Sequence, residues 1–281
     1  MANNKVVDVI VEQVLAQLEK GKVPWNCPYK FGRPRNLVSG KPYRGLNVFL
    51  CNLTMQDEGY TDNVWLTFKQ AQQRGGTVRK GEKSTVVSFY KSDMRNVTNN
   101  ETGADELKRL FMLRYYRVFN IAQCDGVEFT PSEPVEHIES IDQRIKPYMD
   151  TLNGYEVRAD IETPHYQPSI DTVRMLPDTA YPTPSEYYGV LFHELMHSTG
   201  AEHRLKRDLG VMRKGSYSRE ELVAEMGAAL MALETGTEIE PNENHASYIA
   251  GWASQLANQR LWIVWAAGKA QRGADLILGN E

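Results

Sequence analysis

The spacing of apolar residues predicts a helix at the start of the chain and an irregular, strand-rich region after it. Within residues 1–20 the apolar side chains recur every three or four positions, and Gly21 and Pro24 end the pattern. The apolar positions of this helix are Val6, Val7, Ile10, Val11, Val14, Leu15 and Leu18. From Val23 onward, short stretches are separated by Gly and Pro, and the β-branched residues of 85–90 predict a strand.

Further along, the pattern alternates between short ordered elements and polar stretches. Residues 65–76 predict a short helix ended by two glycines, and the Asn-rich residues 93–106 predict a mobile loop. Residues 113–121 predict a buried strand. Residues 126–140 are rich in Pro, Ser and Glu, which is typical of a linker between domains.

The second half of the chain predicts helices around a few strands. A helix over 141–153 precedes strand-like stretches, the last of which is 169–175, predicted to be an edge strand. Three helical regions follow, at about 185–199, 218–235 and 246–274. We therefore expect an α+β protein of two domains, residues 1–125 and residues 141–281, joined by the linker.

Composition narrows the class of protein. The 281 residues are 41% hydrophobic and 24% charged, which is ordinary for a globular protein. No apolar run approaches the roughly 18 residues that span a bilayer, and Asp8 and Glu12 interrupt the first apolar stretch. Cys27, Cys51 and Cys124 are too far apart for a disulfide framework or a cysteine metal site. We expect a soluble, cytoplasmic protein with no membrane partner.

The net charge of −4 conceals a division between the two halves. Residues 1–125 hold 19 basic and 12 acidic residues, whereas residues 126–281 hold 13 basic and 24 acidic ones. The halves therefore carry +7 and −11, and such an asymmetry indicates a nucleic-acid-binding segment joined to another module.

The strongest chemical signal is the pair His193 and His197, with Glu194 between them. Residues four apart on a helix share a face, so both imidazoles could hold one metal ion, while Glu194 could accept a proton from water. The flanking residues are apolar, and a buried helix is a poor place for unbound imidazoles. A motif of only three fixed residues also occurs by chance in many proteins. A hydrolytic zinc site needs a third protein ligand, so the metal interpretation depends on finding one elsewhere in the chain.

Two residues compete to be the third metal ligand. Glu221 and Glu225 lie one turn apart on a predicted helix, and this arrangement resembles the gluzincins. That resemblance implies that Glu221 binds the metal and Glu225 orients the first histidine. His203 instead fits the string HExxHxxGxxH of the metzincins, although no Met-turn follows convincingly. We favour Glu221, zinc as the metal, and manganese or another divalent ion as the alternative.

The first half combines basic and aromatic residues. Between Lys22 and Lys91 there are 12 basic and 4 acidic residues with aromatic residues among them, a pairing that suits single-stranded nucleic acid. The same composition fits a solvated surface whose aromatic residues lie in the core. The candidate DNA-binding residues are Lys41, Tyr43, Arg44, Lys69, Arg79, Lys80 and Lys83.

Several long motifs together resemble one family over nearly the whole chain. The first half, with VPWNCPY, SGKPYRGLN and WLTFKQAQQRGGTVRKGEKST, is similar to the N-terminal domain of ArdC-type antirestriction proteins. The second half, with YYGVLFHELMHSTGAEHRLKRD and REELVAEMGAAL, resembles the zincin-like metallopeptidase domain of the same family. The resemblance implies an N-terminal domain that binds single-stranded DNA without sequence preference, and it favours Glu221 over His203.

The resemblance also implies a biological role. It points to a protein of a conjugative plasmid or phage that acts in the recipient bacterium and protects incoming DNA from restriction. Two mechanisms stay open at this point. In one, the metal domain cleaves an unidentified host protein; in the other, the chain coats DNA and the metal site is structural or vestigial.

Overall fold

The computed structural model describes residues 2–25, 32–98, 105–131, 141–209, 218–237 and 245–280. Its N-terminal part contains, in chain order, α1 (Ala2–Glu19), β1 (Arg35–Asn36), α2 (Leu46–Glu58), β2 (Val64–Leu66), α3 (Phe68–Gln73), β3 (Thr77–Val78), β4 (Thr85–Thr98), β5 (Asp105–Asn120) and β6 (Cys124–Asp125). Four strands form a sheet in the order β1-β2-β5-β4, and β3 pairs with β6. β1 runs parallel to β2, and the other neighbours are antiparallel. The helix predicted at the start of the chain is thus observed, whereas the one predicted over 65–76 begins only at Phe68, after the buried strand β2.

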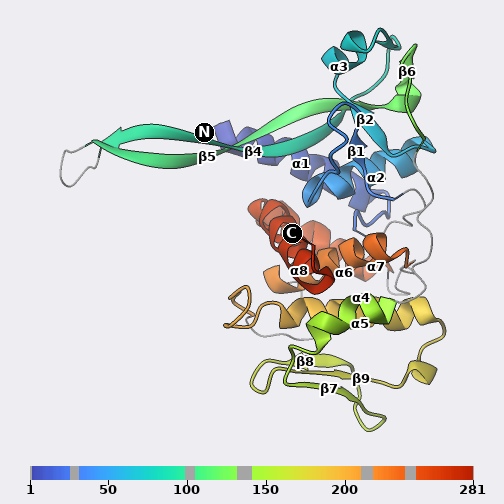
Figure 1. Ribbon diagram of the computed structural model, residues 1–281, viewed down its shortest axis with the longest axis vertical. Coiled ribbons are helices and arrows are strands. Elements are labelled where there is room, and N and C mark those ends of the chain that lie inside the picture. The colour runs from blue at the N-terminus through green and yellow to red at the C-terminus, as the bar shows by residue number, and fades with distance from the viewer. Residues whose placement is uncertain are drawn as a thin grey trace.

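The strands β4 and β5 form a long hairpin that projects from the N-terminal part as an arm (Figure 1). They pair from Thr85 opposite Val118 to Thr98 opposite Asp105. The loop predicted over 93–106 is therefore wrong for 93–98 and 105–106, and residues 99–104 lie outside the described residues. The strand predicted to be buried over 113–121 is present up to Asn120, but residues 114–117 are exposed, and only its end, with Val118 and Asn120, is buried. The arm strands find their hydrogen-bond partners in each other, so polar side chains on both faces do not prevent strand formation.

The C-terminal part contains α4 (Ile141–Met149), β7 (Gly154–Val157), β8 (His165–Gln167), β9 (Thr172–Met175), α5 (Pro184–Ser198), α6 (Arg219–Thr235), α7 (His245–Asn258) and α8 (Leu261–Leu278). Its sheet has the order β7-β9-β8. β9, which corresponds to the predicted edge strand, is therefore the central strand, and β8 is an edge. The helix predicted over 246–274 is divided into α7 and α8. In the described ranges no helix combines the length and apolar character needed to cross a bilayer.

The two parts of the chain share one hydrophobic core. Buried residues of α1 and α2 belong to the same cluster as buried residues of α5, α6, α7 and α8. Trp25 packs edge-on against Trp252, with ring centroids 5.8 Å apart. Arg33 forms an ion pair with Glu234 at 2.9 Å. Residues 126–131 of the predicted linker carry no helix or strand, and residues 132–140 lie outside the described residues.

Small residues allow the helices of the C-terminal part to approach closely. A Cβ atom at Gly227 of α6 would lie 2.3 Å from Cε of Met196, and one at Gly273 of α8 would lie 2.2 Å from Sδ of the same residue. Met196 of α5 is fully buried between them. This close packing brings the first turn of α6 beside the last turns of α5, where the predicted metal ligands lie.

Candidate metal centre

Two neighbouring helices bring His193, His197 and Glu221 together. The first helix, α5, begins after Thr183, whose side chain accepts a hydrogen bond from the N–H of Glu186. The second, α6, begins after Ser218, whose hydroxyl accepts a hydrogen bond from the N–H of Glu221 at 3.1 Å. One potential ligand atom from each of the three residues lies within 4.8 Å of the others.

The distances between these ligand atoms are near those of a tetrahedral metal site, with each imidazole facing a different oxygen of Glu221. The two Nε2 atoms of His193 and His197 are 3.1 Å apart, and they lie 3.4 Å and 3.6 Å from the two carboxylate oxygens of Glu221. Ligand atoms held about 2.0–2.1 Å from a tetrahedral metal are separated by about 3.3 Å. The donor set of two imidazoles and one carboxylate also matches that of hydrolytic zinc enzymes. Both tests favour a divalent metal between the three residues.

Without a metal, the three residues form a network of opposite charges. Burial alone would lower the pKa of His197, but hydrogen bonds to Glu220 and Glu221 outweigh it and raise the pKa to about 9. Burial would likewise raise the pKa of Glu221, but hydrogen bonds from His193 and His197 lower it to about 2. The carboxylates around the two imidazoles therefore favour a positive charge at this point, which a bound metal ion would supply in place of the protons.

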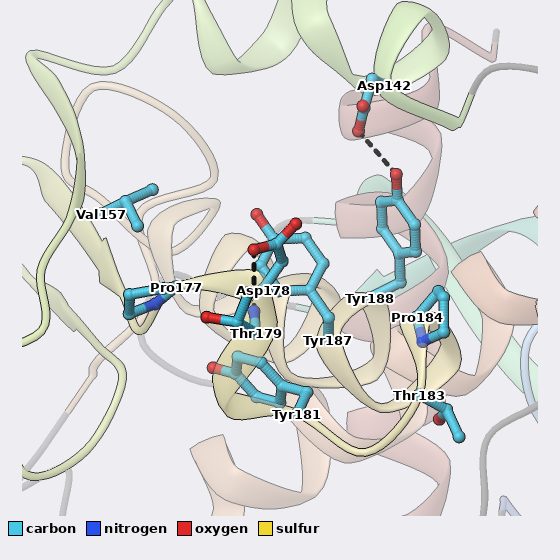
Figure 2. Close-up of a pocket in the computed structure, with 10 residues that line it drawn as sticks. All are labelled: Asp142, Val157, Pro177, Asp178, Thr179, Tyr181, Thr183, Pro184, Tyr187 and Tyr188. Carbon is cyan, nitrogen blue, oxygen red and sulfur yellow. Dashed lines mark hydrogen bonds between the residues drawn. The ribbon is translucent and has the colours of Figure 1, made fainter.

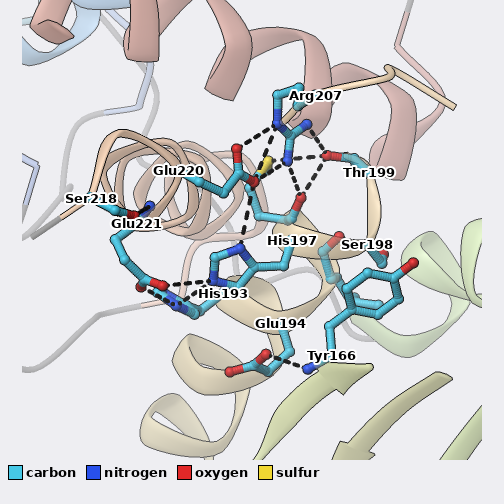
Figure 3. A network of polar contacts seen from close by, with 12 residues as sticks. Tyr166, His193, Glu194, His197, Ser198, Thr199, Arg207, Ser218, Glu220 and Glu221 are labelled. Carbon is cyan, nitrogen blue, oxygen red and sulfur yellow. Dashed lines mark hydrogen bonds and ion pairs between the residues drawn. The ribbon is translucent and has the colours of Figure 1, made fainter. Parts of the chain in front are cut away.

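Glu194 lies beside the three residues and contacts the edge strand β8. Its side chain is buried, and Oε2 accepts a hydrogen bond of 2.7 Å from the backbone N–H of Tyr166 (Figure 3). That N–H belongs to the strand next to α5, so the bond ties the central residue of the motif to the sheet. The arrangement fixes the carboxylate of Glu194 close to the metal ligands.

A buried ion pair that no pattern in the sequence indicates supports His197. Oε1 of Glu220 lies 3.5 Å from Nδ1 of His197. The guanidinium of Arg207 donates to Glu220 at 2.6 Å and 3.0 Å, and to Oγ1 of Thr199 at 2.7 Å (Figure 3). Glu220 and Glu221 are both buried, so the start of α6 does not present them as a solvated face. The only signal in the sequence was the adjacency of two glutamates at a helix start, and nothing pointed to Arg207.

Glu225 connects the site to the N-terminal part of the chain. Burial raises the pKa of its carboxyl group, and the nearby His193 opposes that effect. The hydroxyl of Tyr248 hydrogen-bonds to Glu225 and accepts a hydrogen bond of 3.2 Å from Nε1 of Trp25. Glu225 therefore lies close to the first histidine and is linked to a tryptophan from the other end of the chain.

His203, the rival ligand, lies apart from the three residues. Its side chain is 59% exposed, and Nε2 is 3.4 Å from Oδ2 of Asp171. Asp171 is in turn held by two hydrogen bonds from Arg204, at 2.6 Å and 2.9 Å. The geometry thus favours Glu221 as the third ligand.

A pocket of about 520 Å³ lies beside the first turns of α5 (Figure 2). Tyr181 and Tyr187 line it, with ring centroids 5.4 Å apart. Tyr187 precedes Glu194 by seven residues, so the two lie on the same face of the helix, about 10 Å apart along its axis. The pocket therefore lies about two helical turns from Glu194, and none of the three candidate ligands lines it.

The predicted DNA-binding residues fall into three groups. Lys41, Lys69, Lys80 and Lys83 are exposed. Arg44 pairs with Asp275 of α8, and Arg79 pairs with Glu82 and Asp125, so both take part in contacts within the fold.

The third group is Tyr43 alone, and the structure contradicts its prediction as a DNA-binding residue. Its side chain is only 5% exposed and lies in a core cluster with Trp65, Val87 and Val118. Burial also raises the pKa of its hydroxyl group. An aromatic ring that fills the core cannot stack on a base at the surface.

Two family models match the two parts of the chain. Residues 4–119 match the model described as the N-terminal domain of anti-restriction factor ArdC, and residues 148–269 match the model of a zincin-like metallopeptidase. The fold and the site therefore define a zincin-like metallopeptidase domain joined to an ArdC-type N-terminal domain. The chain belongs to the ArdC antirestriction family, and both the predicted family and the predicted α+β fold class are confirmed.

Individual proteins show the same likeness over most of the chain. The antirestriction protein ArdC from plasmid R388 superposes with a TM-score of 0.78 in its metal-free form and 0.75 in its Mn(II)-bound form, at 29% and 28% identity. Both comparisons cover 98% of this chain and 97% of the other. The uncharacterized protein y4eC of Sinorhizobium fredii is 34% identical, over 98% of this chain and 92% of its own. A DNA primase, TraC of Escherichia coli, is 30% identical, and this chain spans 27% of its length.

Proposed function

We propose that the protein is an antirestriction factor that binds single-stranded DNA and carries a metallopeptidase site. It acts in the cytoplasm of a bacterium that receives a conjugative plasmid or phage, and it protects the incoming DNA from restriction. The observation that carries the peptidase part is the placement of His193, His197 and Glu221 around one point, with Glu194 beside them. The Mn(II)-bound form of R388 ArdC supports a divalent metal, and the donor set suits zinc.

The residues of the site have distinct roles in this proposal. His193, His197 and Glu221 hold the metal, which supplies Lewis acidity that polarises a carbonyl group and lowers the pKa of water to roughly 7. Glu194 accepts a proton from water and passes it to the leaving amine. Glu220 and Glu225 orient the two imidazoles from behind. The substrate is an unidentified host protein.

The N-terminal part supplies the DNA-binding function in this proposal. Its match to the ArdC N-terminal domain and its charge of +7 over residues 1–125 both support a polyanionic partner. Lys41, Lys69, Lys80 and Lys83 are exposed and can reach phosphate groups.

Metal content and peptide hydrolysis test the peptidase part. After loading with zinc or manganese and removal of free metal, the wild type and His203→Gln should hold one metal ion per chain, and Glu221→Gln should hold much less. Glu194→Gln should keep its metal but fail to hydrolyse a quenched fluorescent peptide library that the wild type cleaves. If His203→Gln lost the metal and Glu221→Gln retained it, the ligand assignment would be wrong.

A further inference from the structure

Most of the exposed aromatic residues of the described chain lie on the hairpin arm formed by β4 and β5. Large aromatic side chains that are exposed are Phe68, Phe89, Tyr115 and Tyr116, at 48%, 44%, 40% and 47%. All four belong to the N-terminal part, and three of them lie on the arm formed by β4 and β5 (Figure 1). Exposed rings cost free energy in water, so their concentration on a projecting arm indicates a contact surface.

Two of these rings form a supported pair on one face of the arm. Val87 lies opposite Tyr116 in the antiparallel register and Phe89 opposite Arg114, so these residues share a face, whereas Tyr115 points to the other face. The rings of Phe89 and Tyr116 meet edge to face, with centroids 5.4 Å apart. Beneath them, the buried ring of Tyr43 lies 6.2 Å from Phe89. The core therefore holds the pair in place while solvent reaches its outer side.

The charge around the pair suits a polyanion. The half of the arm next to the sheet, residues 85–92 and 111–120, contains Lys91, Arg114 and Arg117 and no acidic residue. Arg114 and Arg117 are exposed, and Arg114 lies directly opposite Phe89. A second copy of the chain would bring these cations against one another, whereas the phosphates of a nucleic acid would neutralise them.

We infer that Phe89, Tyr116 and Arg114, here called the aromatic face, form the surface on which bases of single-stranded DNA stack. The inference rests on the proposed DNA-binding function and names a site for it. Rings that are held rigid and face solvent can stack on any base, and an arginine beside them can neutralise the adjoining phosphate. The stacking role expected for Tyr43 thus belongs to the rings that Tyr43 supports.

Fluorescence anisotropy of a labelled oligo(dT) strand, titrated with the full-length protein at low salt, tests the inference. Phe89→Leu and Tyr116→Leu keep an apolar side chain but lose the ring, and each should weaken binding by about 5- to 150-fold. Tyr116→Phe, which keeps the ring, should bind like the wild type. Tyr115→Leu, on the opposite face, is the matched control and should also bind like the wild type. Arg114→Gln should lower the slope of log K against log salt by about 0.7.

The outcomes separate the inference from the proposed function. If the wild type binds and both leucine variants bind equally well with unchanged thermal stability, the aromatic face is not the site, although the DNA-binding function stands. If the wild type does not bind the strand at low salt, the DNA-binding function itself fails. If light scattering shows a dimer that Phe89→Leu converts to a monomer, the face joins copies of the chain and the inference is overturned.

Discussion

Arg207 and Glu220 form a buried ion pair directly behind His197, one of the three proposed metal ligands. The two guanidinium nitrogens of Arg207 donate to Glu220 at 2.6 Å and 3.0 Å, and Glu220 lies 3.5 Å from Nδ1 of the imidazole. Neither side chain of the pair is more than 3% exposed. Since a carboxylate at Nδ1 fixes the ring and its tautomer, the pair determines how well Nε2 presents to a metal.

Replacing Arg207 should therefore weaken metal binding without touching a ligand. Arg207→Met leaves Glu220 without its cation, and we expect the metal affinity to fall about 10- to 100-fold in a competition titration with a chelator. Arg158→Met, which removes an exposed arginine paired with Asp160, is the matched control and should bind metal like the wild type. The double variant Arg207→Met/Glu220→Met should be more stable than Arg207→Met, because no unpaired buried charge remains. Its metal affinity should stay low, because no carboxylate then lies at Nδ1 of His197. An unchanged affinity in both variants would show that the ion pair only stabilises the fold.

The shared core predicts that the two parts of the chain unfold together. Trp25 is 2% exposed, packs on Trp252 and donates to Tyr248, which hydrogen-bonds to Glu225. Trp25→Ala should lower the free energy of unfolding by about 3–5 kcal/mol, in one transition seen by calorimetry and near-ultraviolet circular dichroism. Phe68→Ala removes an aromatic ring of 48% exposure and should change stability by less than about 0.5 kcal/mol. Two separate transitions, only one of them shifted by Trp25→Ala, would contradict a shared core.

The buried carboxylate of Asp171, which lies 3.4 Å from His203, should determine part of the stability of the protein in acid. Burial would raise the pKa of Asp171, but hydrogen bonds from Arg204 and Tyr166 outweigh it and hold the pKa below the usual range of an aspartate. The folded pKa thus lies below the unfolded one, so this stabilisation is complete above about pH 5 and is lost as the pH falls through the folded pKa.

The variant Asp171→Asn removes that titration. It should be less stable than the wild type by about 3 kcal/mol at neutral pH, because Arg204 loses its buried partner. Urea unfolding from pH 7 to pH 3 should show the difference shrinking below about pH 4. Asp150→Asn, at the exposed ion pair with Lys146, should follow the wild-type curve at every pH. If the stability difference between the wild type and Asp171→Asn grew as the pH fell, the pKa of Asp171 would not be lowered in the folded protein.

Local patterns in the sequence singled out the three residues that the fold brings together, and long-range contacts account for what was missed. His193 and His197 are four residues apart, so helix geometry alone places them together, and Glu221 stood at the start of the next strong helix. Arg207 reaches Glu220 only through the packing of a loop on two helices, which no spacing in the sequence reveals. Whether Glu220 is buried or solvated is likewise decided by that packing.

The N-terminal part shows the same contrast. Basic and aromatic residues alternate there, but the sequence could not tell that Tyr43 is buried while Phe89 is exposed, because both lie in similar stretches. The sequence predicted strands shorter than β4 and β5. The outer parts of these strands pair only with each other, so they need no alternation of apolar and polar residues, and that alternation is the signal from which a strand is predicted. The pairing order of β7, β8 and β9 also depends on contacts between distant residues, which is why the central strand was expected at an edge.

The central claim is that protection from restriction depends on hydrolysis at the metal centre. Its most direct test is the survival of an unmodified conjugative plasmid in a restricting recipient, compared with a non-restricting one, when the plasmid encodes either the wild type or Glu194→Gln. Metal content, expression and oligonucleotide binding of the variant are checked beforehand and should equal those of the wild type. We predict that the wild type protects the plasmid and Glu194→Gln does not. Equal protection by the variant would contradict the claim and assign protection to DNA coating alone.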